Sequence, residues 1–139
     1  MDEILRSQMR SEFHRVFRAF RDDPAALRGE QFLLGRLLHQ HGEWLGLFEQ
    51  PEPRLLDVPG EVNPYLHISL HVAVEQQLEA DDPPATRHTL ARLQRAGLDG
   101  HEARHRIMTA VAEEMAAATR NGTGFDTARF VRRLEELRP

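Results

Sequence analysis

The chain has 139 residues, 29% of them charged, no cysteine and a formal net charge of −4 at pH 7. This length suits one domain with a single core. Without cysteine there are no disulfides, thiolate metal ligands or thiol nucleophiles. All the basic residues are arginine, which also excludes a Schiff-base lysine and a phosphate-loop lysine. Charges of both signs are interleaved, the N-terminus is too polar for a signal peptide, and no apolar run is long enough for a membrane span. We therefore expect a cytoplasmic protein that binds neither nucleic acid nor membrane.

The first predicted helix covers residues 3–21. Apolar side chains recur there at helical spacing and form one face. His14 lies off this face, so we expect it at the protein surface. The residues of the apolar face are Met9, Phe13, Val16, Phe17 and Phe20.

A second helix is predicted over about residues 28–48, with a break at Gly29 or Gly35. At about 100° per residue, His41 falls inside the apolar stripe of this helix, whereas His39 points away from it. The segment Gln50–Gly60 holds three prolines and a glycine. We expect this segment to be a loop whose apolar residues pack across the domain.

The central helix is predicted over residues 63–80. Asn63 is a good N-cap and Pro64 suits the first helical position. This helix is apolar nearly all round, which is typical of a buried helix. His67 and His71 lie about 40° apart at the centre of its inward face. An inward imidazole must be neutral, paired or bound to a metal, and a pair spaced four residues apart suits a metal ion.

Three further helices are predicted in the C-terminal half. The first covers about residues 84–96 and stops at Gly97. Asp99 can cap the next, over about residues 100–120, and a short helix follows over about residues 126–137. No segment alternates like a strand. The sequence therefore predicts an all-α fold, a single-domain bundle of about five to six helices spanning the whole chain.

The helix over residues 100–120 carries a second histidine pair. His101 and His105 are four residues apart and share a predicted apolar stripe with Met108 and Met115, so both should point inward. They also belong to a His-Glu-x-x-His sequence, the zinc-protease helix motif, in which Glu102 would activate a metal-bound water. Such a short pattern often arises by chance. Neither a third-ligand helix nor a substrate-binding strand can be found, so we do not favour the protease interpretation.

The predicted metal ligands come from three different helices. A single inward histidine is usually a core residue bonded to a backbone carbonyl, but two pairs and a fifth histidine favour a metal site of the kind built in helical bundles. Glu75 and Glu113 lie where they could add carboxylates, although a solvent-facing glutamate is the alternative for each. Imidazole with carboxylate and no thiolate points to iron, zinc or manganese. The histidines are His41, His67, His71, His101 and His105.

Several of these residues also form a recognisable pattern. The run Asn63-Pro-Tyr-Leu-His67-Ile-Ser-Leu-His71, then Gln77, Asp81-x-Pro83-x-x-x-Arg87 and His101-x-x-x-His105, resembles the uncharacterised bacterial family "domain of unknown function 1841" (DUF1841). The resemblance covers nearly the whole chain and implies a single helical domain without an established activity. The family pattern has a further His-x-x-x-His pair where this chain has His41 and Leu45, and glutamate where it has Gln76. If those positions bind metal in relatives, Leu45 and Gln76 remodel the site here.

The sequence thus favours a helical bundle with a histidine-rich site for one or two transition-metal ions, iron, zinc or manganese. A catalytic ion would make the protein a metal-dependent oxidoreductase or hydrolase, activating dioxygen or water. The alternative is a metal-free interaction or regulatory module with structural histidines. A small-molecule or protein partner and a homodimer are compatible with both interpretations. The expected ligands are His67, His71, His101, His105 and His41, with Glu75 and Glu113 as further ligands or proton acceptors.

Overall fold

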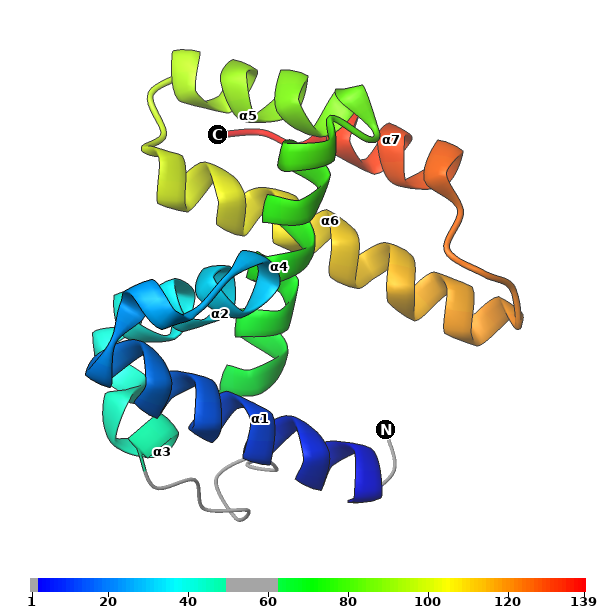
Figure 1. Ribbon diagram of the computed structural model, residues 1–139. Helices are drawn as coiled ribbons and strands as arrows, with labels where there is room; N and C mark the ends of the chain where they lie inside the picture. The colour runs from blue at the N-terminus through cyan, green and yellow to red at the C-terminus, as the bar shows by residue number, and fades with distance from the viewer. Residues whose placement is uncertain (1–2, 50–62) are drawn as a thin grey trace. The chain divides into compact units, whose positions relative to one another are not determined.

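The computed structural model describes residues 3–49 and 63–139, and every regular element in those ranges is helical (Figure 1). The predicted all-α class is confirmed. The loop predicted at Gln50–Gly60 lies outside the described residues. None of the described helices is both long enough and apolar enough to cross a membrane. The helices are α1 (Glu3–Asp22), α2 (Gly29–Gln40), α3 (Leu45–Glu49), α4 (Pro64–Ala80), α5 (Pro84–Arg95), α6 (Gly100–Asn121) and α7 (Thr127–Glu136), with short 3-10 helices at Pro24–Ala26 and Gly42–Trp44.

The chain divides into two compact units, Met1–Val72 and Ala73–Pro139. The first contains α1, α2, α3 and the N-terminal half of α4. The second contains the C-terminal half of α4 together with α5, α6 and α7. A single domain over residues 1–139 remains a prediction.

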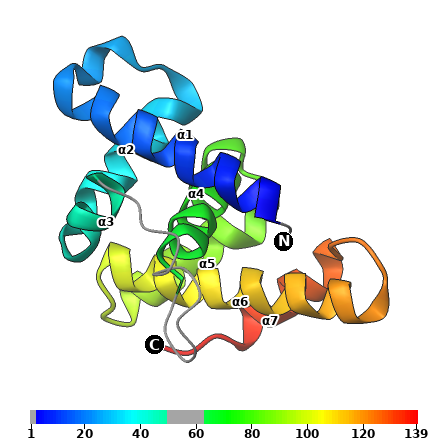
Figure 2. The same cartoon turned by 90° about the horizontal axis from the view of Figure 1, so that it is seen from below.

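In the first unit, α1 and α2 lie side by side (Figures 1 and 2). The predicted apolar face of α1 is confirmed, since Phe13, Val16 and Phe17 are buried. The helices approach closely at Gly35, where a Cβ atom would lie 2.6 Å from Cδ2 of Phe20. Glycine is therefore needed at this position for packing, and α2 continues through it.

The predicted second helix is interrupted at a different place from the one expected. Gly29, with φ of 55°, begins α2. The helix then ends at Gln40, because His41 has φ of −100° and ψ of 75° and leaves the helical region. A 3-10 turn over Gly42–Trp44 and the short helix α3 follow. The expected break at Gly29 or Gly35 within the helix is thus wrong, and the chain is interrupted at His41 instead.

The start of α4 follows the sequence prediction. The Asn63 side-chain oxygen accepts hydrogen bonds from the backbone N–H groups of Tyr65, at 2.9 Å, and Leu66, at 3.3 Å. The predicted inward face of this helix was centred on His67 and His71. Tyr65 lies away from that face and is nevertheless buried, whereas Leu66 is 45% exposed. The reason is aromatic packing, because the Tyr65 ring lies 5.3 Å from that of Phe13 and 5.8 Å from that of Phe48.

In the second unit, the corner between α4 and α5 is held by side chains. The Thr86 hydroxyl donates to the side-chain oxygen of Gln77 at 2.9 Å, and Arg87 donates to the Leu78 carbonyl at 2.6 Å. Arg87 also lies 3.7 Å from the carboxylate of Asp81. These contacts satisfy carbonyl and side-chain groups at a helix end, where the backbone has lost its regular partners.

The rest of the second unit is formed by α5, α6 and α7, with α7 lying beside α6 (Figure 2). The predicted cap of α6 is confirmed, since the Asp99 carboxylate accepts from the N–H of Glu102 at 2.8 Å. Asp126 caps α7 in the same way, at 3.1 Å from the N–H of Arg129. The buried apolar residues of these helices include Leu93, Ile107, Val111, Phe130 and Leu134.

A fully buried carboxylate, Glu114 on α6, ties α7 to this core. Arg129 donates two hydrogen bonds of 2.6 Å to it, and the N–H of Asp126 donates a third at 3.1 Å. The hydrogen bonds from Arg129 are the main reason that the pKa of Glu114 is lowered to about 2, with Asp126 and Arg133 contributing and burial opposing the shift. The apolar pattern of α6 did not predict a buried charge at this position.

We predict that α4 tolerates truncation poorly on its buried side. Val74 is fully buried, so Val74→Ala should lower the free energy of unfolding by about 1–4 kcal/mol. Leu66→Ala on the same helix removes an exposed side chain and should change it by less than about 0.5 kcal/mol. Denaturant unfolding measures both, and equal losses would show that the buried face is assigned wrongly.

We also predict that the Glu114 cluster stabilises the protein in a pH-dependent way. Its folded pKa, about 2, lies below the usual carboxyl value, so ionised Glu114 stabilises the folded state at neutral pH. This contribution should be fully present above pH about 4.5 and lost as pH falls through about 2.

Melting temperatures of wild type and Glu114→Gln should therefore differ at pH 7 and converge in acid. Glu113→Gln, at the exposed neighbouring position, is the matched control and should melt close to wild type at both pH values. A Glu114→Gln gap that stays constant down to pH 2 would contradict the assignment.

Candidate metal centre

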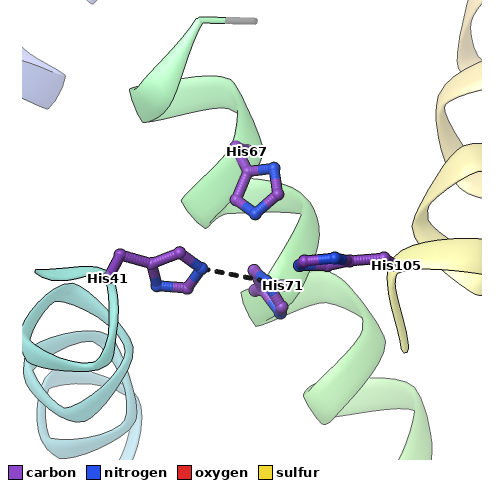
Figure 3. A group of neighbouring side chains, drawn as sticks. All are labelled: His41, His67, His71 and His105. Carbon is purple, nitrogen blue, oxygen red and sulfur yellow. Dashed lines mark hydrogen bonds between the residues drawn. The ribbon is translucent and has the colours of Figure 1, made fainter. Parts of the chain in front are cut away.

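Three of the predicted ligands come together in the first unit (Figure 3). Each of His41, His67 and His71, here called the histidine cluster, offers a ring nitrogen, and these nitrogens lie within 4.8 Å of one another. The ring of His41 lies 5.1 Å from that of His67 and 4.8 Å from that of His71, and the last two are 4.8 Å apart. His41 and His71 are buried, and His67 is half-buried.

His67 and His71 are positioned by α4. They are one turn apart and project from the same side of the helix (Figure 3). Ile68 and Val74, both fully buried, flank them and anchor this stretch of the helix. The spacing of four residues alone predicted this pair.

His41 reaches the cluster because α2 ends there. Its backbone leaves the helical region at this residue, and its side chain extends toward α4 (Figure 3). Its Nδ1 lies 2.7 Å from the carbonyl oxygen of Leu37. A carbonyl can only accept, so Nδ1 carries the hydrogen and the Nε2 of a neutral ring carries a lone pair. That Nε2 lies 3.2 Å from Nε2 of His71.

This geometry suits a shared metal ion. With Zn–N bonds of about 2.0–2.1 Å, a tetrahedral zinc ion separates two ligand nitrogens by about 3.3 Å, close to the observed spacing. Histidines that bind metal commonly donate their other ring N–H to a carbonyl or carboxylate, which fixes the tautomer and the orientation of the ring. His41 already has this arrangement through Leu37.

The second histidine pair lies on α6, in the second unit. The rings of His101 and His105 are 4.1 Å apart. His101 is exposed, whereas His105 is half-buried, with Nδ1 3.6 Å from the carboxylate of Glu102. The expectation that both point inward is wrong for His101, and Met115 of the same predicted stripe is 47% exposed. A role for either histidine as a metal ligand remains a prediction.

The buried face of α6 differs from the predicted stripe because small residues form much of it. Alanines at these positions let neighbouring helices approach closely, and the larger Met115 is left outside. The buried residues of this helix are Ala103, Ile107, Met108, Ala110, Val111, Glu114, Ala117 and Ala118.

Both predicted carboxylate ligands are engaged by arginines within the second unit. Glu75 accepts a hydrogen bond from Nε of Arg104, which joins the C-terminal half of α4 to α6. Glu113 is 57% exposed and lies 3.6 Å from Arg133. These contacts place both carboxylates in ion pairs and leave the histidine cluster without a carboxylate among the described residues.

Three other histidines have structural roles or are exposed. His14 was expected at the surface but is half-buried, with Nδ1 3.1 Å from the carbonyl of Phe48. His39 stacks on Phe17 at 4.1 Å, and its Nε2 lies 3.0 Å from the carbonyl of Phe17. His88 is exposed, as expected. Backbone carbonyls therefore explain His14 and His39 without a metal.

One contact of the cluster was missed from the sequence. Trp44 stacks nearly parallel on His41, with ring centroids 5.6 Å apart, and meets His67 edge-on at 5.1 Å. The sequence feature that could have predicted this contact is the spacing between His41 and Trp44. Three residues match the period of a 3-10 turn, whereas a continuous α-helix was assumed there.

The described helices and the histidine cluster define an all-α protein with a candidate transition-metal centre. The family model of the domain of unknown function DUF1841 matches residues 5–136. The chain therefore belongs to this family, and the resemblance noted in the sequence is confirmed. A comparison with curated proteins found no match, and neither did one with solved structures.

Part of the family-like pattern has a structural explanation. Gln77, Asp81 and Arg87 make the contacts of the α4–α5 corner. His67 and His71, in contrast, lie in the histidine cluster. The pattern therefore combines residues that shape the second unit with residues that form the candidate centre.

We predict that neutral His41 is protonated on Nδ1. Long-range ¹H–¹⁵N correlation spectra of the imidazole should give Nδ1 a pyrrole-like shift and Nε2 a pyridine-like shift, because only Nδ1 faces the Leu37 carbonyl. His88, exposed on α5, is the internal reference for an averaged tautomer. A hydrogen found on Nε2 of His41 would remove the lone pair that a metal needs.

Proposed function

We propose that this protein binds a transition-metal ion through His41, His67 and His71. One observation carries the proposal: Nε2 of His41 lies 3.2 Å from Nε2 of His71 while its Nδ1 faces the Leu37 carbonyl. In this arrangement the lone pair on Nε2 of His41 points toward Nε2 of His71. The distance between the two nitrogens is close to that between two ligands of one ion. Ordinary core histidines such as His39 meet carbonyls instead.

The donor set narrows the choice of ion. Imidazole nitrogens suit zinc, iron, copper and nickel, whereas manganese prefers carboxylate and water oxygens. Because Glu75 and Glu113 are paired with arginines, we favour zinc or iron over manganese among the ions expected from the sequence. His67 is the half-buried member of the cluster, so we expect an ion and water to reach the site past its side chain.

We keep His105, which the sequence predicted as a ligand, as a candidate fourth ligand. The support is the histidine pair His101 and His105 in the sequence, of which His105 is the half-buried member. Its Nδ1 lies 3.6 Å from the carboxylate of Glu102. His101 is exposed and is not part of this proposal.

The number of ligands determines the role of the ion. Four histidines would close a tetrahedral site and make the ion structural. Three would leave a position for water or dioxygen, and the protein would then be a metal-dependent hydrolase or oxidoreductase. His105→Ala separates these cases. If four histidines bind the ion, this variant should lower the affinity for the metal and allow small anions such as azide to bind the ion. If three histidines bind it, the variant should change neither the metal affinity nor the anion binding.

The test is metal content and chelator sensitivity of protein purified without a histidine tag. We predict zinc or iron near one ion per chain, and a melting temperature that falls by about 5–15 °C with chelator, because the ion binds the folded state preferentially. His67→Ala and His71→Ala should remove the chelator-sensitive part, and the exposed control His88→Ala should keep it. Affinity for the ion should also fall as the pH is lowered, because protons compete with the ion for the imidazole nitrogens.

An untagged protein whose melting temperature is unchanged by chelator and by added zinc or iron would contradict the proposal. The contact between His41 and His71 would then be an N–H···N hydrogen bond of a buried core. The protein would be the metal-free interaction or regulatory module that the sequence leaves as the alternative.

A further inference from the structure

Trp44, the one tryptophan of the chain, touches two of the three histidines of the cluster. Its ring lies 5.6 Å from that of His41 with an angle of 6° between the planes, and 5.1 Å from that of His67 with an angle of 75°. A third contact, at 6.4 Å and 79°, is with buried Phe48. The Trp44 side chain is half-buried.

The backbone explains why the indole lies there. His41 and Trp44 bracket the 3-10 turn, and the Trp44 N–H donates to the His41 carbonyl at 3.0 Å. In a 3-10 turn, side chains three residues apart eclipse one another, which brings the two rings face to face. In a continuous α-helix they would diverge by about 60°. The interruption of the helix therefore creates the stacked pair.

We propose that Trp44 is a positioning residue of the metal centre. The face of the indole holds the imidazole plane of His41, and its contact with His67 restrains the second ligand. The π face of tryptophan also attracts positive charge more strongly than that of any other side chain. An imidazole bound to a divalent ion carries part of the charge of that ion, so the indole favours the metal-bound state over the metal-free state.

This inference rests on the proposed metal binding, and it competes with a plainly structural role. If Trp44 only fills space between His41 and Phe48, its removal should lower the stability of metal-free and metal-bound protein equally. A positioning role instead predicts weaker metal binding beyond any loss of stability. The two are separated by measuring affinity and metal-free stability on the same variants.

The experiment uses full-length untagged protein with Zn²⁺ and Co²⁺ as probes. Trp44→Leu should bind Zn²⁺ about three- to tenfold more weakly and show an altered Co²⁺ absorption spectrum, since the ligand rings lose their restraint. Trp44→Phe retains a stacking ring with a weaker π face and should recover most of the affinity. Phe32→Leu, which removes an exposed aromatic ring on α2, is the matched control and should bind like wild type.

Wild-type protein offers an independent readout. Because its sole indole lies against two proposed ligands, Co²⁺ should quench its fluorescence in proportion to metal occupancy, and Zn²⁺ should reverse the quenching by competition. His67→Ala should abolish the effect, whereas His88→Ala should not change it.

The outcomes separate the two proposals. If wild type binds Zn²⁺ and Trp44→Leu binds it equally well with an unchanged Co²⁺ spectrum, the positioning role is overturned and the metal centre stands. If wild type binds neither ion and its fluorescence does not respond, both proposals fail. Should Trp44→Leu not fold, Trp44→Phe decides alone, and an affinity for Zn²⁺ equal to that of wild type would overturn the role.

Discussion

The hydrogen bond from His41 Nδ1 to the Leu37 carbonyl is the contact on which the candidate centre depends. Leu37 lies in the last turn of α2, where carbonyl groups lose their helical donors. The imidazole supplies one, which ends the helix and fixes the tautomer of the ring at the same time. One hydrogen bond therefore ends the helix and also sets the tautomer that the proposed metal ligand needs. The same interruption starts the 3-10 turn that stacks Trp44 on the ring of His41.

Local signals account for the parts of the fold that could be predicted. The starts of α4 and α6 follow from Asn63 and Asp99, whose side chains cap the first backbone N–H groups without help from tertiary structure. His67 and His71 were predicted for the same reason, because a spacing of four residues places two side chains on one side of any helix. These features depend only on residues that are close together in the sequence, so they can be predicted from the sequence alone.

The errors arose where long-range packing decides the outcome. Average hydrophobicity placed His101 and Met115 inward on α6, but the buried face follows small residues such as Ala103 and Ala110 and the charged Glu114. Glu114 is buried because Arg129, fifteen residues further along the chain, neutralises it. His41 was chosen for its place in an apolar stripe, although the property that matters is a local break of the helix. Periodicity assumes that a helix continues, and so it cannot show where one stops.

The proposed metal centre is poor in negative charge. Arginines bind Glu75, Glu113 and Glu114, so the proposed ligands are imidazoles alone, and a divalent ion bound to them would keep most of its charge. A charge in a largely buried site needs oriented dipoles or polarisable groups around it. The Leu37 carbonyl, acting through the ring of His41, and the indole face of Trp44 are the groups of this kind in the first unit. Neutral ligands also strengthen the Lewis acidity of the ion, because no carboxylate or thiolate donates negative charge to it. An ion held in this way would polarise a bound water strongly, which is the property that a hydrolytic centre requires.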